Sequence, residues 1–327
     1  MNCRRAATLV ALLLPTTLAA QASGSDPYAP VVLLLPGSAR ALGMGNVGVA
    51  SRDDDVLFYN PAQIAIARGF SASGERLSAT ATTGALSSVT RFSTGGVALG
   101  MRMVDYKAGA NYFPVNRESM LDDGAATGTS IEAVIGVAQT FKSLRIGANA
   151  KYVEDAVPSI RVGRAAFDLG IAKDMFRSTI GLSVQNLGAA TNVPCGLASS
   201  TRSRDCVIPP GIPPFPPDTR VTSAALPFKA TLGAATARPL GQFDFVGTAA
   251  VSVLRSGFWV PAGGAELGYS WLDGYSIALR AGARRPIVGE GTATAGAGFT
   301  MDRLSIDYAL ETLSGSRIGH RIGLRVR

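Results

Sequence analysis

Apolar and polar residues alternate along a series of stretches that begins near Phe70 and continues to the end of the chain. In one of them Leu144 and Ile146 fall on one side, whereas Arg145 and Lys151 fall on the other. Successive side chains of a β-strand point to opposite faces, so each stretch predicts a strand with one apolar and one polar face. The pattern therefore predicts an all-β protein.

The alternating stretches number fourteen. They lie at 70–79, 84–92, 95–106, 131–141, 143–154, 164–173, 177–187, 226–238, 242–254, 260–270, 274–284, 290–300, 303–311 and 317–327. An even number of antiparallel strands is typical of bacterial single-chain membrane barrels. The alternative is a soluble sandwich, whose strands also alternate but turn their apolar faces inward.

The lengths of the connections separate these two architectures. Very short connections follow even-numbered strands, at Phe141 to Ser143, Pro239 to Gly241, Trp271 to Asp273 and Met301 to Asp302. Two long ones, Lys107 to Ser130 and Gly188 to Ala225, follow odd-numbered strands. Short periplasmic turns and longer extracellular loops are typical of outer-membrane barrels, whereas a sandwich has no reason to sort its loops by strand parity. We therefore expect a transmembrane antiparallel β-barrel in the bacterial outer membrane.

In such a barrel the polar face of each strand lines the lumen and the apolar face contacts lipid. The predicted lumen-facing cations are Arg145, Lys151, Arg280, Arg321 and Arg325. These side chains predict a positively charged lumen.

Residues 1–22 have the features of a cleaved signal peptide. Arg4 and Arg5 precede an apolar core, and Ala20-Gln21-Ala22 provides a small-x-small cleavage site. Cys3 would leave with this peptide. In an exported protein Cys195 and Cys206 are then expected to form a disulfide, with two free thiols as the alternative.

Residues 31–67 break the alternation, so we expect 23–68 to form a separate segment ahead of a barrel at 69–327. Asn60 followed by Pro61 predicts a helix start, because an amide side chain caps the first turn and proline suits its first position. A segment this apolar ahead of the first strand is expected inside the barrel as a plug.

This region also resembles a known family. The run Leu33-Leu34-Leu35-Pro36-Gly37-Ser38-Ala39-Arg40-Ala41-Leu42-Gly43-Met44-Gly45, the acidic residues 53–55 and Tyr59-Asn60-Pro61-Ala62 look like the opening of PorV/PorQ-type proteins. Further similar stretches are 166–170, 185–188, 264–266, 278–282, 307–309 and 320–322. Those proteins belong to the FadL-like group of outer-membrane barrels.

The resemblance implies fourteen strands and an N-terminal plug or hatch. It also implies one of two roles: uptake of hydrophobic molecules, or a type IX secretion shuttle that holds secreted proteins. The hatch residues expected to seat or release the plug are Arg40, Gly43, Gly45, Asn60 and Pro61; the alternative is that they only fill the lumen. The chain departs from such barrels in ending on Val326-Arg327 instead of an aromatic residue, and in its low aromatic content of 7%.

Composition narrows the remaining function classes. Hydrophobic residues make up 47% and charged residues 17%, which excludes a disordered chain. The net charge is +8, but the cations are spread out without interleaved aromatics, so no nucleic-acid partner is expected. The expected partners are outer-membrane lipid together with hydrophobic small molecules or secreted proteins.

No enzymatic activity, cofactor or metal is expected. His320 is the only histidine, and no Ser/His/Asp grouping can be argued around it. Asp53, Asp54 and Asp55 lack the spaced ligands of a calcium loop and are expected in a solvated turn. The glycine-rich run 43–48 fits a dinucleotide fingerprint formally but lacks the βαβ context. The remaining alternative is a structural or adhesive barrel whose proline-rich loop at 209–217 binds a partner.

Overall fold

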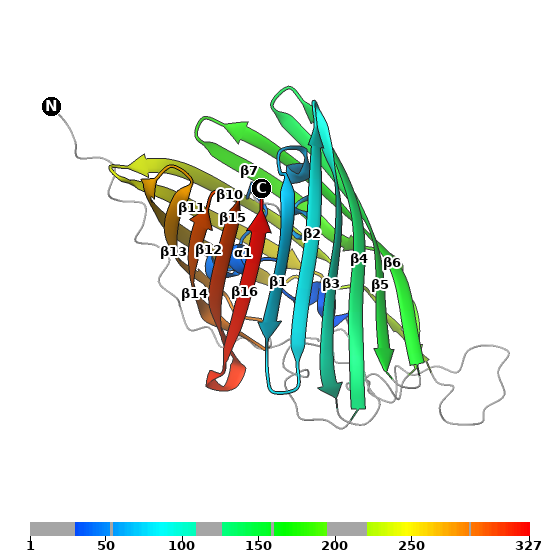
Figure 1. Ribbon diagram of the computed structural model, residues 1–327. Coiled ribbons are helices and arrows are strands. Elements are labelled where there is room, and N and C mark those ends of the chain that lie inside the picture. Colours follow the sequence, from blue (N-terminus) through cyan, green and yellow to red (C-terminus); the bar gives the residue numbers. More distant parts are fainter. Residues whose placement is uncertain (1–29, 53–54, 109–125, 158–159, 195–220, 288) are drawn as a thin grey trace, which may run out of the picture.

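The computed structural model describes residues 30–52, 55–108, 126–157, 160–194, 221–287 and 289–327. Fourteen strands form one closed antiparallel barrel, in which the first strand pairs with the last (Figure 1). They are β1 (Gly69–Arg76), β2 (Thr82–Phe92), β3 (Gly95–Ala108), β4 (Ala126–Phe141), β5 (Leu144–Val157), β6 (Ile160–Met175), β7 (Ser178–Leu187), β10 (Lys229–Leu240), β11 (Phe243–Leu254), β12 (Trp259–Leu272), β13 (Tyr275–Arg284), β14 (Glu290–Met301), β15 (Leu304–Leu313) and β16 (Ile318–Val326). The predicted fold class is confirmed.

The burial of the strand residues shows which face is inside. On β5 the Arg145 side chain is 3% exposed, whereas the neighbouring Ile146 is 43% exposed. The same inversion holds on β16, where Arg321 is buried and Ile322 is exposed. Polar inside and apolar outside is the arrangement of a barrel in lipid, and it excludes a soluble sandwich.

The two ends of the barrel carry different connections. The turns at 93–94, 142–143, 176–177, 241–242, 273–274 and 302–303 join consecutive strands at one end, which we name the short-turn rim. The opposite end, the long-loop rim, includes the connection between β7 and β10, in which β8 (Thr191–Pro194) and β9 (Val221–Ala224) form a small separate sheet. The predicted sorting of loops by strand parity is confirmed.

Several strands extend further toward the long-loop rim than predicted. β4 begins at Ala126 instead of residue 131, and β6 begins at Ile160 instead of residue 164. The added residues of β4 are Ala126, Thr127, Gly128, Thr129 and Ser130. These small or polar residues show no apolar alternation, which is why the sequence pattern missed them.

The helical elements are short and lie mainly ahead of β1. They are η1 (Val31–Leu34), α1 (Ala39–Gly43), η2 (Val56–Phe58), η3 (Pro61–Ala65) and, before β16, η7 (Ser314–Ser316). Within the described residues, no helix is long and apolar enough to cross a membrane. The first four helices contact the barrel strands from the inside, where Figure 1 shows them in blue.

Candidate functional site

The candidate site is the contact between the barrel and residues 30–52 and 55–67, which we name the lumenal segment. Its side chains are buried almost throughout; Val32, Leu42, Leu57 and Ile64 have no exposed surface. The segment has two main places of contact with the wall. η2 and η3 pack against β2–β6, whereas α1 packs against β13–β16.

The first contact, which we name the apolar seat, is a packed hydrophobic cluster. From the segment it contains Val56, Leu57, Phe58 and Ile64, among others. The wall supplies small inward-facing residues, which are Ala85, Val89, Ala98, Val134 and Ala138. Burial of this much apolar surface stabilises the segment without requiring specific geometry.

Polar side chains of the wall bind the backbone of the segment at the apolar seat. Asn149 donates a hydrogen bond to the carbonyl oxygen of Leu57 at 2.9 Å, and Gln185 donates one to that of Phe58 at 2.9 Å. These bonds satisfy backbone carbonyls that would otherwise be buried without partners. They also fix the position of η2 along the barrel axis.

Asn60 and Pro61 begin η3, as predicted. The Asn60 side chain accepts a hydrogen bond from the backbone N–H of Ala62 at 3.0 Å, and Pro61 occupies the first position. The Asn60 amide nitrogen also donates to the carbonyl oxygen of Val49 at 2.8 Å. It reaches the wall at the carbonyl of Ile171, 3.3 Å away.

Glycines in the wall make room for this close approach. Gly147 of β5 and Gly170 of β6 are direct cross-strand partners. A Cβ atom at Gly147 would overlap the backbone of Pro61, and one at Gly170 would overlap the side chain of Asn60. A similar pair, Gly264 and Gly282, lies beneath residues 44–45 on the opposite wall. These glycines are needed because the segment's backbone lies directly on the sheet.

The second contact, which we name the ionic seat, is a chain of buried charges below α1. The guanidinium of Arg40 binds both carboxylate oxygens of Glu266, at 2.8 and 2.6 Å. Glu266 also accepts from Arg280 at 2.5 Å, and Arg280 lies 2.7 Å from Asp307. Asp307 in turn accepts from Arg325 at 2.6 Å. Arg40 thus joins the segment to charged side chains on four strands.

The two predicted hatch glycines lie at the ionic seat for different reasons. Gly43 lies against the wall at Gly296, where an added Cβ would come within 3.3 Å of the Gly296 Cα. Gly45 has φ of +76°, a conformation that favours glycine. The Gly45 N–H donates to the hydroxyl of Thr294 at 2.9 Å.

A second ionic group lies between the apolar seat and the long-loop rim. Arg102 binds Glu132 and also donates to the carbonyl of Leu35 at 2.6 Å. Lys151 lies 3.1 Å from Glu132 and 2.8 Å from Asp168. The wall therefore holds the segment's backbone near η1 as well as near η2.

The five predicted lumen cations are all buried inside the barrel, but the lumen is not positive. Arg145 binds Asp174 at 2.6 and 2.9 Å, and Arg321 lies 2.9 Å from Glu75. Among the described residues, the buried basic side chains are as many as the buried acidic ones. The basic ones are Arg102, Arg145, Lys151, Arg164, Arg280, Arg284, Arg321 and Arg325; the acidic ones are Asp55, Glu75, Glu132, Asp155, Asp168, Glu266, Asp307 and Glu311. The expectation of a positive lumen was wrong because buried charges require partners.

Tyr59 ties distant parts of the lumenal segment to one another. Its hydroxyl accepts from the N–H of Gly37 at 3.2 Å and lies 2.7 Å from the side-chain oxygen of Asn46, to which it donates. Burial, with the nearby Asp55 carboxylate as the next cause, raises the pKa of the Tyr59 phenol above its ordinary value. The phenol therefore stays protonated and keeps its donor.

A third apolar group, which we name the η1 cluster, lies toward the long-loop rim. Val31, Val32 and Leu35 of the segment pack there against wall and loop residues. These residues are Leu77, Ala81, Val104, Tyr106 and Val153. The lumen is thus apolar at this level although most of its wall is polar.

Other predicted features lie outside the site or outside the described residues. Cys195, Cys206 and the proline-rich run fall in 195–220, which the structure does not describe. Asp55 was expected in a solvated turn, but it is 4% exposed and precedes η2, so that expectation was wrong for this residue. His320 faces outward on β16, where its Nδ1 lies 2.7 Å from the Tyr308 hydroxyl.

Sequence reasoning missed the wall residues that receive the segment. Glu266 and Gln185 fall within the family-like stretches 264–266 and 185–188, and Asn149 falls within the predicted strand 143–154. Their position on the polar face of an alternating stretch was visible. The sequence did not show which backbone carbonyls these side chains bind.

Three solved structures share this fold along most of their length. The toluene transporter TodX of Pseudomonas putida is 11% identical with a TM-score of 0.53, and the match covers 92% of this chain and 98% of that one. The CymD monoaromatic hydrocarbon channel has a TM-score of 0.55 at 11% identity, covering 90% and 98%. A Pseudomonas aeruginosa FadL homologue has a TM-score of 0.50 at 12% identity, covering 88% and 97%. No protein-family model and no curated protein matches the sequence.

Proposed function

We propose that this chain is an outer-membrane channel for hydrophobic molecules, of the FadL-like type, and that the lumenal segment is its gate. The observation that carries the proposal is the seating of the lumenal segment inside a closed fourteen-stranded barrel. The fold that it shares with TodX, CymD and a FadL homologue supports the same role. Residues 1–22 act as the export signal.

The short-turn rim faces the periplasm in this proposal, and the long-loop rim faces the cell exterior. Both ends of the mature chain then lie on the periplasmic side. Among the described groups, a molecule that enters from outside reaches the η1 cluster before the apolar seat. Its wall residues, such as Val104, Tyr106 and Val153, offer an apolar surface that the segment's own Val31 and Val32 now cover.

We expect passage to require the segment to leave at least one of its seats, because its side chains are buried against the wall. α1 is the half that we expect to move. It is held by directional ionic contacts at Arg40 and contributes Ala41 to the hydrophobic cluster, whereas η2 and η3 are held mainly by that cluster. Hatch residues Gly43 and Gly45 lie at this movable half, and Asn60 and Pro61 lie at the fixed half.

A disulfide across the ionic seat tests the gate. Gly43→Cys and Gly296→Cys, in a Cys195→Ser, Cys206→Ser background, place two thiols where the segment touches β14. The protein is reconstituted into vesicles, and uptake of a hydrophobic fluorophore is followed with and without reductant. We expect uptake to be blocked in the oxidised form and restored by reduction. The single Gly43→Cys variant is the matched control and should not respond to reductant.

Equal uptake by the oxidised and reduced double variant, with the crosslink verified by mass spectrometry, would mean that the α1 half is not the gate. Absence of uptake by every form, including the parent protein, would contradict the channel role itself. The two parts of the proposal therefore fail separately.

A PorV/PorQ-type role in type IX secretion is the second candidate. It is favoured by the residues that carry the family resemblance, since Leu33 to Gly45 and Tyr59 to Ala62 lie within the lumenal segment. Purification from the native membrane in mild detergent, followed by mass spectrometry, discriminates the two. Secreted proteins or secretion components that stay bound support the shuttle; bound apolar small molecules support the channel.

A further inference from the structure

Three successive turns of the short-turn rim share one arrangement. Each carries an exposed phenylalanine next to a cation: Arg91-Phe92 between β2 and β3, Phe141-Lys142 between β4 and β5, and Phe176-Arg177 between β6 and β7. The three rings are 49%, 59% and 104% exposed. Aromatic rings at strand ends mark the level where the hydrocarbon of a bilayer meets its headgroups.

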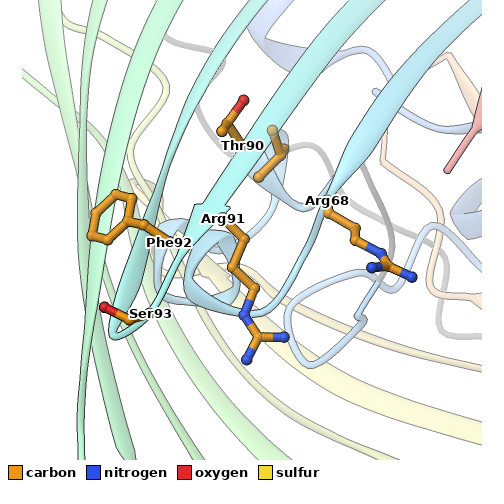
Figure 2. A pocket seen from close by; sticks show the side chains of 6 residues that line it. Arg68, Thr90, Arg91, Phe92 and Ser93 are labelled. Atoms are coloured by element: carbon orange, nitrogen blue, oxygen red, sulfur yellow. The ribbon is translucent and has the colours of Figure 1, made fainter.

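The first of these turns borders an open cavity of about 520 Å³. Its lining is Arg68, Val89, Thr90, Arg91, Phe92 and Ser93. Figure 2 shows the guanidinium groups of Arg68 and Arg91 on one side of the turn, with the ring of Phe92 pointing away from them. Among the described residues, neither guanidinium has a hydrogen-bond or ion-pair partner, in contrast to the paired cations of the lumen.

Among the described residues, cations outnumber carboxylates on this part of the rim. In the described short-turn half of β1–β7, the exposed cations Arg68, Arg91, Lys142, Lys173 and Arg177 face a single rim carboxylate, Asp174. Asp174 is already bound by Arg145 and Arg52. On the other arc, the exposed carboxylates Asp244, Asp273 and Asp302 are matched in number by the exposed cations Arg238, Arg303 and Arg327. The positive charge is therefore concentrated on one side of the rim.

We propose that the short-turn rim from β1 to β7 binds the headgroups of anionic phospholipids, and that the cavity at Arg68 and Arg91 holds a headgroup phosphate. Guanidinium groups bind phosphate oxygens in paired hydrogen bonds. The three phenylalanines hold the same rim at the depth of those headgroups. The inference needs the barrel to span a bilayer, but it does not depend on the transport role.

The test compares lipid selectivity of the full-length protein in vesicles. Wild type and Arg68→Gln/Arg91→Gln are reconstituted into phosphatidylcholine containing spin-labelled phosphatidylglycerol or spin-labelled phosphatidylcholine. The fraction of motionally restricted label gives the preference for the anionic lipid. We expect the wild type to prefer phosphatidylglycerol, and the preference to fall about fivefold for each arginine replaced, since that is the attraction of one cation near an anionic surface.

Arg303→Gln is the matched control, because Arg303 is an exposed cation at a short turn on the other arc. It should leave the preference unchanged. Folding of each variant is verified by the shift in electrophoretic mobility that heating causes in folded barrels. Equal preference in wild type and the folded double variant would overturn the proposal, and so would an equal loss in Arg303→Gln.

Inorganic phosphate, added at the concentration of the labelled lipid and at constant ionic strength, separates the two sources of the ligand. Retention of the phosphatidylglycerol preference supports a lipid headgroup site. Complete loss of the preference would mean that the cavity binds free phosphate in place of lipid, and the lipid proposal would fall.

Discussion

The lumenal segment is held at two seats of opposite chemistry. At the apolar seat, η2 and η3 bury Leu57, Phe58 and Ile64 against small side chains of β2–β4. At the ionic seat, α1 is held by the bidentate contact of Arg40 with Glu266. The first contact tolerates small shifts because hydrophobic burial has no direction. The second loses most of its stabilisation when one partner is removed, because the remaining charges are buried without compensation.

In the proposed gate, this difference would let one segment both close and open the channel. A hydrophobic cluster keeps half of the segment in the barrel, and a charge network holds the other half only while its pairs are complete. Four substitutions, from the largest expected effect to the smallest, probe this contrast.

Glu266→Gln should have the largest effect. It removes the carboxylate that Arg40 and Arg280 share. Loss of one partner from a buried ionic network costs about 3–5 kcal/mol. We expect α1 to leave its seat and trypsin to cut after Arg40 while the barrel stays folded.

The measurement is the rate of tryptic cleavage at Arg40, read by mass spectrometry, alongside the heat-dependent gel shift of the barrel. Asp244→Asn, which removes an exposed rim carboxylate, is the control. If cleavage stayed at the wild-type rate, the ionic seat would not be what holds α1.

Gly170→Ala tests the apolar seat. Its Cβ would overlap the side chain of Asn60, so η3 must shift. Overpacking of a tight contact costs about 1–3 kcal/mol. We expect a lower urea midpoint in detergent micelles but little cleavage at Arg40, because the ionic seat is intact. Gly74→Ala, whose Cβ would meet nothing closer than 3.8 Å, should be neutral; a similar loss there would contradict the close-contact argument.

Asn60→Ala removes a helix cap and two contacts with backbone carbonyls. The loss of a cap costs about 0.5–2 kcal/mol. Asn60→Asp keeps the cap acceptor but loses the donor to Val49 and Ile171. Comparison of the two variants therefore separates the contribution of the cap from that of the two donated hydrogen bonds. Urea unfolding of both is the measurement. Wild-type stability in Asn60→Ala would show that the cap contributes nothing.

Tyr59→Phe should have the smallest effect, about 1 kcal/mol for its lost hydrogen bonds. The pKa of Tyr59 is raised in the folded state. Its contribution to stability is therefore fully present below the ordinary tyrosine pKa of about 10 and is lost as pH rises above that value. The difference in unfolding free energy between wild type and Tyr59→Phe should shrink at alkaline pH. A constant difference across this range would contradict the buried, protonated phenol.

Much of the barrel could be predicted from the sequence because strand alternation is a local property. Leu144 to Lys151 reveal their two faces within eight neighbouring positions, whatever the rest of the chain does. The helix start at Asn60-Pro61 is equally local, since the cap bonds to a backbone N–H two residues away. The sequence could not reveal where β4 begins, because small polar residues carry no periodic signal, whereas the first residues of β6, Ile160 to Gly163, do alternate.

The ionic seat could not be predicted. Arg40 and Glu266 are separated by 226 positions and meet only because the barrel closes and the lumenal segment enters it. For the same reason the sequence predicted the lumen-facing cations but not the carboxylates that pair with them.

Sequence alone thus determined the number of strands, the face of each strand and the sorting of the loops. Each of these depends on residues near one another in the chain. The tertiary structure decided which glycines touch the segment, which carboxylate each arginine binds, and that the lumen is balanced in charge. Those features depend on strand register and barrel closure, which bring distant residues into contact and which no local pattern encodes.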